Sequence, residues 1–486
     1  MLWRPGGSRR PKRCTDQRPP NVRATTVLAA VLAALVGTLA SSFAANDPDL
    51  FWHLASGAWM LDHGRLLERD VFSATMAGAP YSVGQWLGEV VFAALYRAGG
   101  WVALDLLRAA LVGVAAFFTA RVVLRVQPQP AWAIGPIVAA LLVSKFLWGD
   151  RPQLFSLALF PAVFDVLLAA RFGSPRRLWV LVPVMLVWAN LHGAFVAGLA
   201  LIVVFVVEAW ITHTPHRRLF TAVAVLAAGA SIVTPSGIFA FSFAASYART
   251  ASAVVEERPV DITSPAGLVF VALLLGTLLV ALVADRRELS TRLRSPILWV
   301  GMVVPFTILG LAHQRLLPYA AMILAPLVAT MVPSLVGRVE AAAPIMPRAA
   351  AVLALAPLFA AAAAVSFVLA PGAPDLSAYP SGATDALRQR PGPLLNEYDW
   401  GGYLIFAVPE QPTFVDGRGA ALFPAELIGE FETAVGLQIG YRRVLDGHGI
   451  RLVLLRPGRA LAVALREDGW PVVAEQPGSW VLLQRP

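Results

Sequence analysis

Long apolar segments dominate the chain up to residue 370 and are separated by short polar connections. A helix needs about 20 mainly apolar residues to cross the hydrocarbon core of a bilayer. Eleven segments approach that length, at 26–45, 101–123, 131–148, 153–171, 177–191, 194–212, 219–234, 264–284, 295–312, 317–334 and 348–370. This pattern predicts an α-helical polytopic membrane protein with about eleven transmembrane helices.

The loop at 46–100, between the first two spans, is too long for a simple connection. It begins with Asp47 before Pro48, an order typical of a helix N-cap followed by the first helical residue. Residues 50–63 present an apolar and aromatic face with few charges, which favours a helix lying in the membrane interface. A second amphipathic stretch covers 83–96. We therefore expect two interfacial helices in this loop.

The composition changes after Pro371, where charged residues return and long apolar runs stop. Short strand-like runs occur at 393–397, 413–416, 451–455, 471–474 and 480–484. Helical patterns alternate with them, at 384–389, 425–435, 441–447 and 460–467. This alternation predicts a small α/β domain at 371–486. Its turn-rich segments 399–403 and 416–419 are compatible with simple turns or with contacts to a substrate.

Composition supports the membrane assignment. The 486 residues are 57% hydrophobic and 14% charged, whereas soluble domains average about 45–50% apolar and about 25% charged residues. A soluble enzyme, a disordered regulator and a disulfide-stapled protein are therefore excluded; Cys14 is the only cysteine. The net charge is +9, and residues 1–25 hold seven Arg and Lys against one Asp. Charge concentrated before the first span is a topology signal and does not indicate a nucleic-acid partner.

Alternating the spans from a cytoplasmic tail at 1–25 places 20 basic residues on the cytoplasmic side and 7 outside. This bias follows the positive-inside rule and predicts an integral plasma (inner) membrane protein. The membrane domain would cover 26–370, and the domain at 371–486 would be extracytoplasmic. The basic tail, the first apolar run and the segment 42–45 also resemble a cleaved signal peptide, but we expect an uncleaved signal-anchor.

Under this topology, ionisable residues from five loops gather at the outer face. They are Asp47, Asp49, His53, Asp150, Arg151, His192, Glu256, Glu257, His313 and Arg315. Such residues are costly near a membrane and commonly mark functional sites. Each also has a simpler explanation: Asp47 as a helix cap, Asp150 and Arg151 as an ion pair, or Arg315 reaching out from a span end.

The first outer loop resembles that of the GT-C class of membrane glycosyltransferases. This class includes the oligosaccharyltransferase catalytic subunit, the protein O-mannosyltransferases and the aminoarabinose transferase. In these families an acidic motif follows the first span and an interfacial helix follows the motif. The matching segments here are Asp47-Pro48-Asp49, Met60-Leu61-Asp62-His63-Gly64, Gly78-Ala79-Pro80-Tyr81 and Gln85-Trp86-Leu87.

The chain is similar above all to a bacterial group of this class. That likeness is carried by Arg151-Pro152-Gln153-Leu154-Phe155-Ser156, Trp188-Ala189-Asn190-Leu191-His192-Gly193 and Asn396-Glu397-Tyr398-Asp399-Trp400-Gly401-Gly402-Tyr403. No Lys-Pro-Pro segment follows the first loop, and the acceptor motif of the oligosaccharyltransferase is absent. The identities of donor and acceptor therefore do not carry over.

The resemblance implies an enzyme that transfers a sugar, with inversion, from a polyprenyl-phosphate carrier to an envelope acceptor at the outer face. Asp47 would be the catalytic base, with Asp49 as second choice. Arg315 would hold the lipid phosphate, with Arg151 in reserve. The remaining substrate contacts would come from His53, His192, Glu257 and His313.

Asp47 and Asp49 would also suit a divalent metal ion, Mg²⁺ or Mn²⁺, because oxygen ligands suit these ions. Two other functions remain open. A non-catalytic protein that organises the envelope would use the same fold without the chemistry. A lipid or glycolipid transporter is less favoured, because polarity lies on one side of the membrane and no internal repeat is evident.

Overall fold

The computed structural model describes residues 22–82, 84–241, 259–283, 293–336 and 348–486. Each apolar segment predicted to span the membrane contains a helix. These helices are α1 (Val22–Ser41), α3 (Trp86–Val126), α4 (Pro130–Ser144), α5 (Gln153–Arg171), α6 (Leu181–Leu191), α7 (Phe195–Ile211), α8 (Arg217–Ser231), α10 (Pro265–Val283), α12 (Pro296–Ala312), α13 (Leu317–Val336) and α14 (Arg348–Leu369).

Within the described residues, four helical stretches are long and apolar enough to cross a bilayer: Ala24–Ser41, Trp86–Val126, Pro130–Leu147 and Gln153–Arg171. Four shorter apolar stretches accompany them: Phe195–Ile211, Pro265–Leu279, Pro296–Ala312 and Leu355–Leu369. The protein is thus a mostly helical integral membrane protein, and the number of spans stays a prediction. The 3₁₀ helix η2 (Pro175–Val180) precedes α6, which has only 11 residues.

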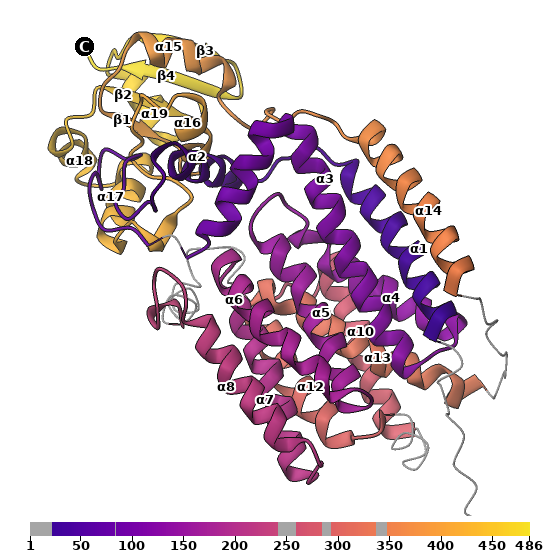
Figure 1. The fold of residues 1–486 in the computed structure, drawn as a ribbon. Coiled ribbons are helices and arrows are strands. Elements are labelled where there is room, and N and C mark those ends of the chain that lie inside the picture. The colour runs from indigo at the N-terminus through magenta and orange to yellow at the C-terminus, as the bar shows by residue number, and fades with distance from the viewer. Residues whose placement is uncertain (1–21, 83, 242–258, 284–292, 337–347) are drawn as a thin grey trace, which may run out of the picture.

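Small residues allow α1 to pack closely against α3. A Cβ atom on Gly37 would lie 2.7 Å from the carbonyl oxygen of Ala109, and one on Gly113 would lie 3.1 Å from that of Ala33. Close backbone approach through glycine and alanine is common between membrane helices. On its other side α1 packs against α14, which runs beside it in Figure 1.

The first outer loop forms a helix where the capping signal predicts one. Helix α2 (Pro48–His63) has Asp47 as its N-cap, and it ends at Gly64, which has the left-handed conformation (φ 61°) that glycine adopts without strain. The second amphipathic stretch is the first part of α3, which Gly99 and Gly100 separate from the apolar remainder of that helix. This first part of α3 packs against α2.

The C-terminal domain has the predicted α/β character. Helices α15 (Thr384–Gln389), α17 (Ala425–Val435), α18 (Tyr441–Gly447) and α19 (Ala460–Glu467) surround a sheet in the order β1-β2-β4-β3. Its strands are β1 (Leu394–Asn396), β2 (Leu452–Leu455), β3 (Val472–Gln476) and β4 (Trp480–Gln484). β1 and β2 are parallel, and the other two pairings are antiparallel.

Two sequence expectations for this domain are wrong. The segment 413–416 is not a strand of the sheet; instead Thr413 forms an isolated bridge with Ser73 of the first outer loop. The segment at 399–403 is not only turns, because it begins helix α16 (Gly401–Ala407) after the 3₁₀ helix η6 (Tyr398–Trp400). Both segments contact the first outer loop, Thr413 through Ser73 and α16 through α2, and the local sequence does not reveal these contacts.

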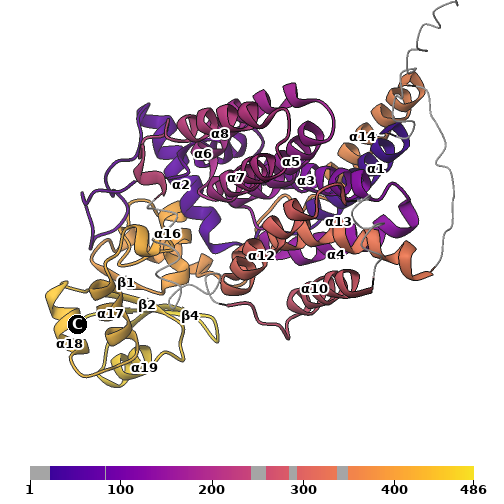
Figure 2. The same cartoon turned by 90° about the horizontal axis from the view of Figure 1, so that it is seen from below.

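The C-terminal domain lies on α2. Both views show α2 between α16 and the helical bundle (Figure 1 and Figure 2). The ring of Phe51 on α2 lies 5.1 Å from that of Tyr379 and 5.3 Å from that of Tyr403, measured between centroids. Leu50 and Leu54 of α2 belong to the core of the membrane domain, whereas Met60 and Phe51 belong to two cores formed mainly by the C-terminal domain, so this helix is shared by three hydrophobic cores.

Candidate functional site

The acidic motif is fixed at the start of α2. Asp47 accepts a hydrogen bond from the backbone N–H of Asp49 through Oδ1 at 3.0 Å. Its Oδ2 faces Gly149, where a Cβ atom would lie only 2.4 Å away. The missing side chain at Gly149 therefore brings the Asp47 carboxylate against the connection between α4 and α5.

Arg151, in that same connection, pairs with both carboxylates of the motif. Its Nε lies 2.7 Å from Asp47 Oδ2, and its Nη1 donates to Asp49 Oδ2 at 2.7 Å. Trp52 Nε1 donates to Asp49 Oδ1 at 3.0 Å. All three charged side chains are only partly exposed, between 9% and 23%. One guanidinium thus fixes the distance between the two carboxylates, as the forked geometry of arginine allows.

Asp150 does not form the ion pair with Arg151 that the sequence allowed. It accepts a hydrogen bond from Arg108 of α3, which also donates to Asp105 Oδ1 at 2.7 Å and to the carbonyl oxygen of Ala40 at 2.9 Å. All three charged residues are buried. Asp150 and Arg151 thus belong to two separate clusters of charged residues. Asp150 pairs with Arg108 inside the bundle, and Arg151 pairs with the acidic motif.

His53 is one turn after Asp49 and pairs with a residue that sequence analysis missed. Its Nδ1 lies 3.0 Å from Glu89 Oε1 in the first turn of α3, and both residues are buried. Burial lowers the pKa of His53 well below its ordinary value, and the charges of Arg151 and His192 lower it further. The only available signal for Glu89 was its place as a single acid in the amphipathic stretch 83–96.

Two of the three segments that carry the likeness to the bacterial group, 151–156 and 188–193, contact each other. Ser156 Oγ lies 2.8 Å from His192 Nδ1 and accepts a hydrogen bond from Trp188 Nε1 at 2.7 Å. Desolvation lowers the pKa of His192, and the charges of Arg315 and Arg151 act in the same direction. His192 therefore lies within electrostatic reach of both arginines that were proposed for the lipid phosphate.

The other predicted site residues lie at the same end of the bundle or outside the described part. Arg315 lies in the 3₁₀ helix η4 (Gln314–Leu316), which connects α12 to α13. His313 is the residue just before η4. The structure thus brings Asp47, Asp49, His53 and Arg151 together, with His192 and Arg315 beside them. Glu256 and Glu257 lie outside the described residues. The arginine that contacts the acidic motif is Arg151, the reserve choice.

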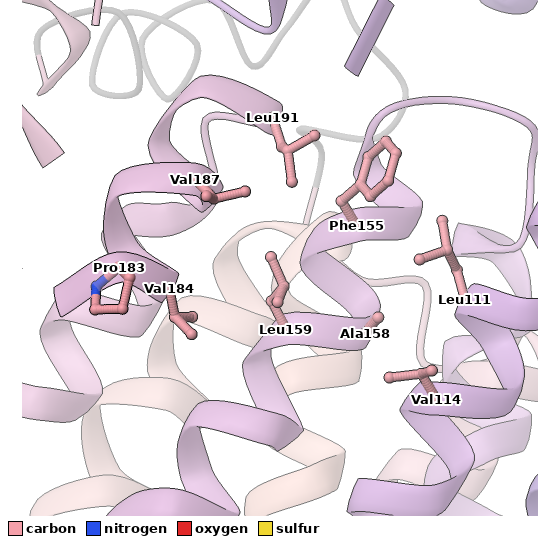
Figure 3. Close-up of a pocket in the computed structure, with 9 residues that line it drawn as sticks. All are labelled: Leu111, Val114, Phe155, Ala158, Leu159, Pro183, Val184, Val187 and Leu191. Atoms are coloured by element: carbon pink, nitrogen blue, oxygen red, sulfur yellow. The ribbon is translucent and has the colours of Figure 1, made fainter. Parts of the chain in front are cut away.

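The membrane domain contains an apolar groove, and one of its lining residues, Leu191, adjoins His192 in the chain. The groove has a volume of about 390 Å³ and lies between α3, α5 and α6 (Figure 3). Its lining residues are Leu111, Val114, Phe155, Ala158, Leu159, Pro183, Val184, Val187 and Leu191. Leu191 and Phe155 immediately precede His192 and Ser156, which contact each other. Val114 and Val187 are 40% and 46% exposed, so the groove opens on the side of the bundle.

The expected metal ion has a competitor at the acidic motif. Arg151 already pairs with Asp47 Oδ2 and Asp49 Oδ2, so an ion bound to both carboxylates would have to displace the guanidinium. Within the described ranges, no group of three or more His, Cys, Asp or Glu side chains is arranged to hold a metal ion. A divalent metal ion at Asp47 and Asp49 stays a prediction.

Comparison with known proteins shows the fold. No family model and no curated protein matches the chain. An oligosaccharyltransferase of Archaeoglobus fulgidus in its apo form is similar, with a TM-score of 0.60, 13% identity, and coverage of 89% of this chain and 69% of the other. Archaeal oligosaccharyltransferase AglB from the same organism, in complex with an inhibitory peptide and a dolichol-phosphate, is also similar, with a TM-score of 0.51 and 12% identity. This alignment covers 95% of the chain and 74% of AglB.

ArnT from Cupriavidus metallidurans, bound to undecaprenyl phosphate, is similar with a TM-score of 0.52 and 16% identity. This alignment covers 95% of the chain and 98% of ArnT, so the two proteins correspond over nearly their whole lengths. The oligosaccharyltransferase and ArnT are both GT-C glycosyltransferases. The chain therefore has the fold of the GT-C membrane glycosyltransferases, the class that its first outer loop resembles.

Proposed function

We propose that the protein is an inverting glycosyltransferase that moves a sugar from a polyprenyl-phosphate carrier to an acceptor of the cell envelope. The observation that carries this proposal is the meeting of the acidic motif, Arg151 and His192 at one end of an apolar groove open to the side. A donor with a charged head and a long hydrocarbon chain needs such a combination of polar site and lateral groove.

The polar residues would serve the transfer step as follows. The acceptor hydroxyl attacks the anomeric carbon of the sugar and gives its proton to the Asp47 carboxylate. The bond between that carbon and the phosphate oxygen breaks, and the electron pair leaves with the phosphate. The positive charges of Arg151 and Arg315 stabilise the developing negative charge. Asp49 would hold Arg151 in place, since the two are 2.7 Å apart.

The groove between α3, α5 and α6 would hold the first isoprene units of the carrier. Its lining is entirely aliphatic or aromatic, and it ends next to the Ser156–His192 contact. Similar structures were solved with dolichol-phosphate and with undecaprenyl phosphate, two lipids of this class. We further propose that this end of the bundle and the C-terminal domain face the outside, with the basic tail in the cytoplasm, as the distribution of arginine predicts.

The test compares the envelope lipids of cells that lack the gene with those of the same cells carrying a copy of the gene on a plasmid. We expect a polyprenyl-phosphate sugar to accumulate without the gene and to disappear with the wild-type copy, measured by mass spectrometry of extracted lipids. Asp47→Ala should fail to remove the accumulated lipid although the protein inserts at normal levels. Asp62→Ala is the matched control, because Asp62 lies on the same helix but is exposed and pairs only with the exposed Arg97 among the described residues.

If Asp47→Ala removes the lipid as well as the wild type does, the base assignment is wrong. If deletion of the gene changes no polyprenyl-phosphate sugar, the transferase proposal itself fails, and a role in organising the envelope becomes the better explanation.

A further inference from the structure

A glycine of the C-terminal domain lies directly against the acidic motif. A Cβ atom on Gly417 would lie 2.3 Å from Asp49 Oδ1 and 3.1 Å from Trp52 Nε1. These are the two atoms that form the hydrogen bond between Trp52 and Asp49. The backbone of Gly417 does not have a left-handed φ, so a methyl group at this position would cause no backbone strain and would meet the Asp49 carboxylate directly.

A second glycine, Gly402 of α16, packs against the same tryptophan. A Cβ atom on Gly402 would lie 2.8 Å from the carbonyl oxygen of Pro48 and 3.2 Å from Trp52 Cδ1. Trp52 is itself buried, with 5% of its surface exposed. The C-terminal domain therefore contacts both the backbone at the start of α2 and the side chain that donates to Asp49.

The loop that carries Gly417 is anchored on both sides. The next residue, Arg418, is fully buried and donates from Nε and Nη2 to Asp416 at 2.8 and 2.7 Å. Its Nη1 donates to Asp70, which belongs to the first outer loop. Its guanidinium carbon also lies 5.3 Å from the ring centroids of Phe72 and Tyr81. Buried ion pairs with complete hydrogen bonding hold one geometry, because any displacement leaves a charge unpaired.

Backbone hydrogen bonds tie the same two segments together. Thr413 N–H donates to the carbonyl oxygen of Phe72 at 3.1 Å, and Ala74 N–H donates to that of Thr413 at 2.8 Å. Thr75 Oγ1 donates to the carbonyl oxygen of Phe414 at 2.6 Å. The first outer loop thus pairs with the segment that leads into Gly417.

From these contacts we infer that the loop 416–419 is a positioning element of the transferase site and that Gly417 is its positioning residue. The loop holds Trp52 and the Asp49 carboxylate in the orientation in which Asp49 pairs with Arg151. The inference rests on the proposed function. It adds that the C-terminal domain contributes contacts to the site itself, through Gly417, and does not only lie over α2. A methyl group at Gly417 would push Asp49 away from Trp52 and change its pairing with Arg151.

The experiment combines transfer with a thermal double-mutant cycle on the purified full-length protein in detergent. In the cell-based lipid assay, Gly417→Ala should lower transfer by about a hundredfold, the size of loss that a displacement of about 1 Å near reacting groups produces. Gly429→Ala is the matched control in the same domain, because a Cβ atom there has nothing within 4 Å. It should transfer as the wild type does.

The cycle measures the contact without any activity. Gly417→Ala should lower the melting temperature of the wild type, and this effect should shrink in the Asp49→Ala background, where the clashing carboxylate is absent. An equal effect in both backgrounds, or normal transfer by Gly417→Ala, would overturn the inference. Failure of the wild-type gene to remove any polyprenyl-phosphate sugar would refute the proposed function instead, while the thermal cycle would still decide whether Gly417 positions Asp49.

Discussion

At the scale of single residues, His53 makes the pH dependence of stability predictable. Burial and the charges of Arg151 and His192 lower the pKa of His53 in the folded protein well below 6.5. Unfolded chains take up a proton on this ring below about pH 6.5, whereas the folded protein does not. The contribution of His53 to the free energy of unfolding should therefore decrease as the pH falls below about 6.5, by up to about 1.4 kcal/mol for each pH unit. Burial raises the pKa of its partner Glu89, which acts in the opposite direction, so a comparison with a His53 variant isolates the contribution of His53.

The measurement is the melting temperature of the detergent-solubilised protein between about pH 7.5 and pH 5. His53→Gln keeps a donor for Glu89 and removes the titration, so the melting temperature of this variant should depend less on pH. His63→Gln, at the exposed end of the same helix, should leave the slope as it is in the wild type. Equal slopes for His53→Gln and the wild type would contradict the assigned role.

The sequence predicts which charged residues lie at the same face of the membrane, but it does not predict which of them form ion pairs or hydrogen bonds with each other. The alternation of spans placed Asp47, Arg151 and His192 in loops at one face, and the structure brings them together. Pairing depends on distances that only packing fixes. Asp150 and Arg151 are adjacent in the chain but point to different clusters, and Glu89 becomes a partner of His53 only because α3 packs on α2.

At the scale of elements, the break in α3 decides where Glu89 lies. Gly100 has φ 61° and ψ −150°, a conformation almost restricted to glycine. A Cβ atom there has nothing within 4 Å, so the only cost of alanine is backbone strain. Gly100→Ala should lower the free energy of unfolding by about 1–3 kcal/mol and disturb the contact of residues 86–98 with α2.

Gly429 in α17 supplies the control for this prediction. It is inside a helix, and a Cβ atom there also has nothing within 4 Å. Gly429→Ala should keep or slightly raise the melting temperature, because alanine has the higher helix propensity. Equal melting temperatures for the two alanine variants would show that the non-helical conformation of Gly100 is not required for stability.

Elements with a strong periodic or capping signal were predictable, and elements that depend on another segment were not. The Asp47-Pro48 cap and the apolar face of 50–63 predicted α2 to within two residues at its start. The segment 413–416 has the composition of a strand, yet it pairs through a single bridge with the outer loop, more than 300 residues earlier. Local composition carries no information on such a distant partner.

At the scale of the whole molecule, Arg418 joins the C-terminal domain to the membrane domain. Burial lowers the pKa of Arg418, but the carboxylates of Asp416 and Asp70 raise it by more, so the guanidinium stays charged. Removal of the cation would leave two buried carboxylates facing each other without a partner. Breaking such a group typically costs about 3–5 kcal/mol, far more than the loss of an exposed pair.

Arg418→Met should therefore release the C-terminal domain from the first outer loop, because the carboxylates of Asp416 and Asp70 repel each other once the cation between them is removed. We expect a lower melting temperature and, under limited proteolysis, faster cleavage between the membrane domain and residues 371–486. Arg442→Met is the control: Arg442 pairs with Asp468 on the exposed surface of the same domain, and its loss should change neither result. Since Gly417 adjoins Arg418, the released domain would also free Asp49, and transfer should fall even in the fraction of protein that remains intact. Arg418→Met with wild-type cleavage and wild-type transfer would show that the backbone hydrogen bonds of Thr413 and the apolar contacts of Phe51 hold the two domains together without the ion pairs of Arg418.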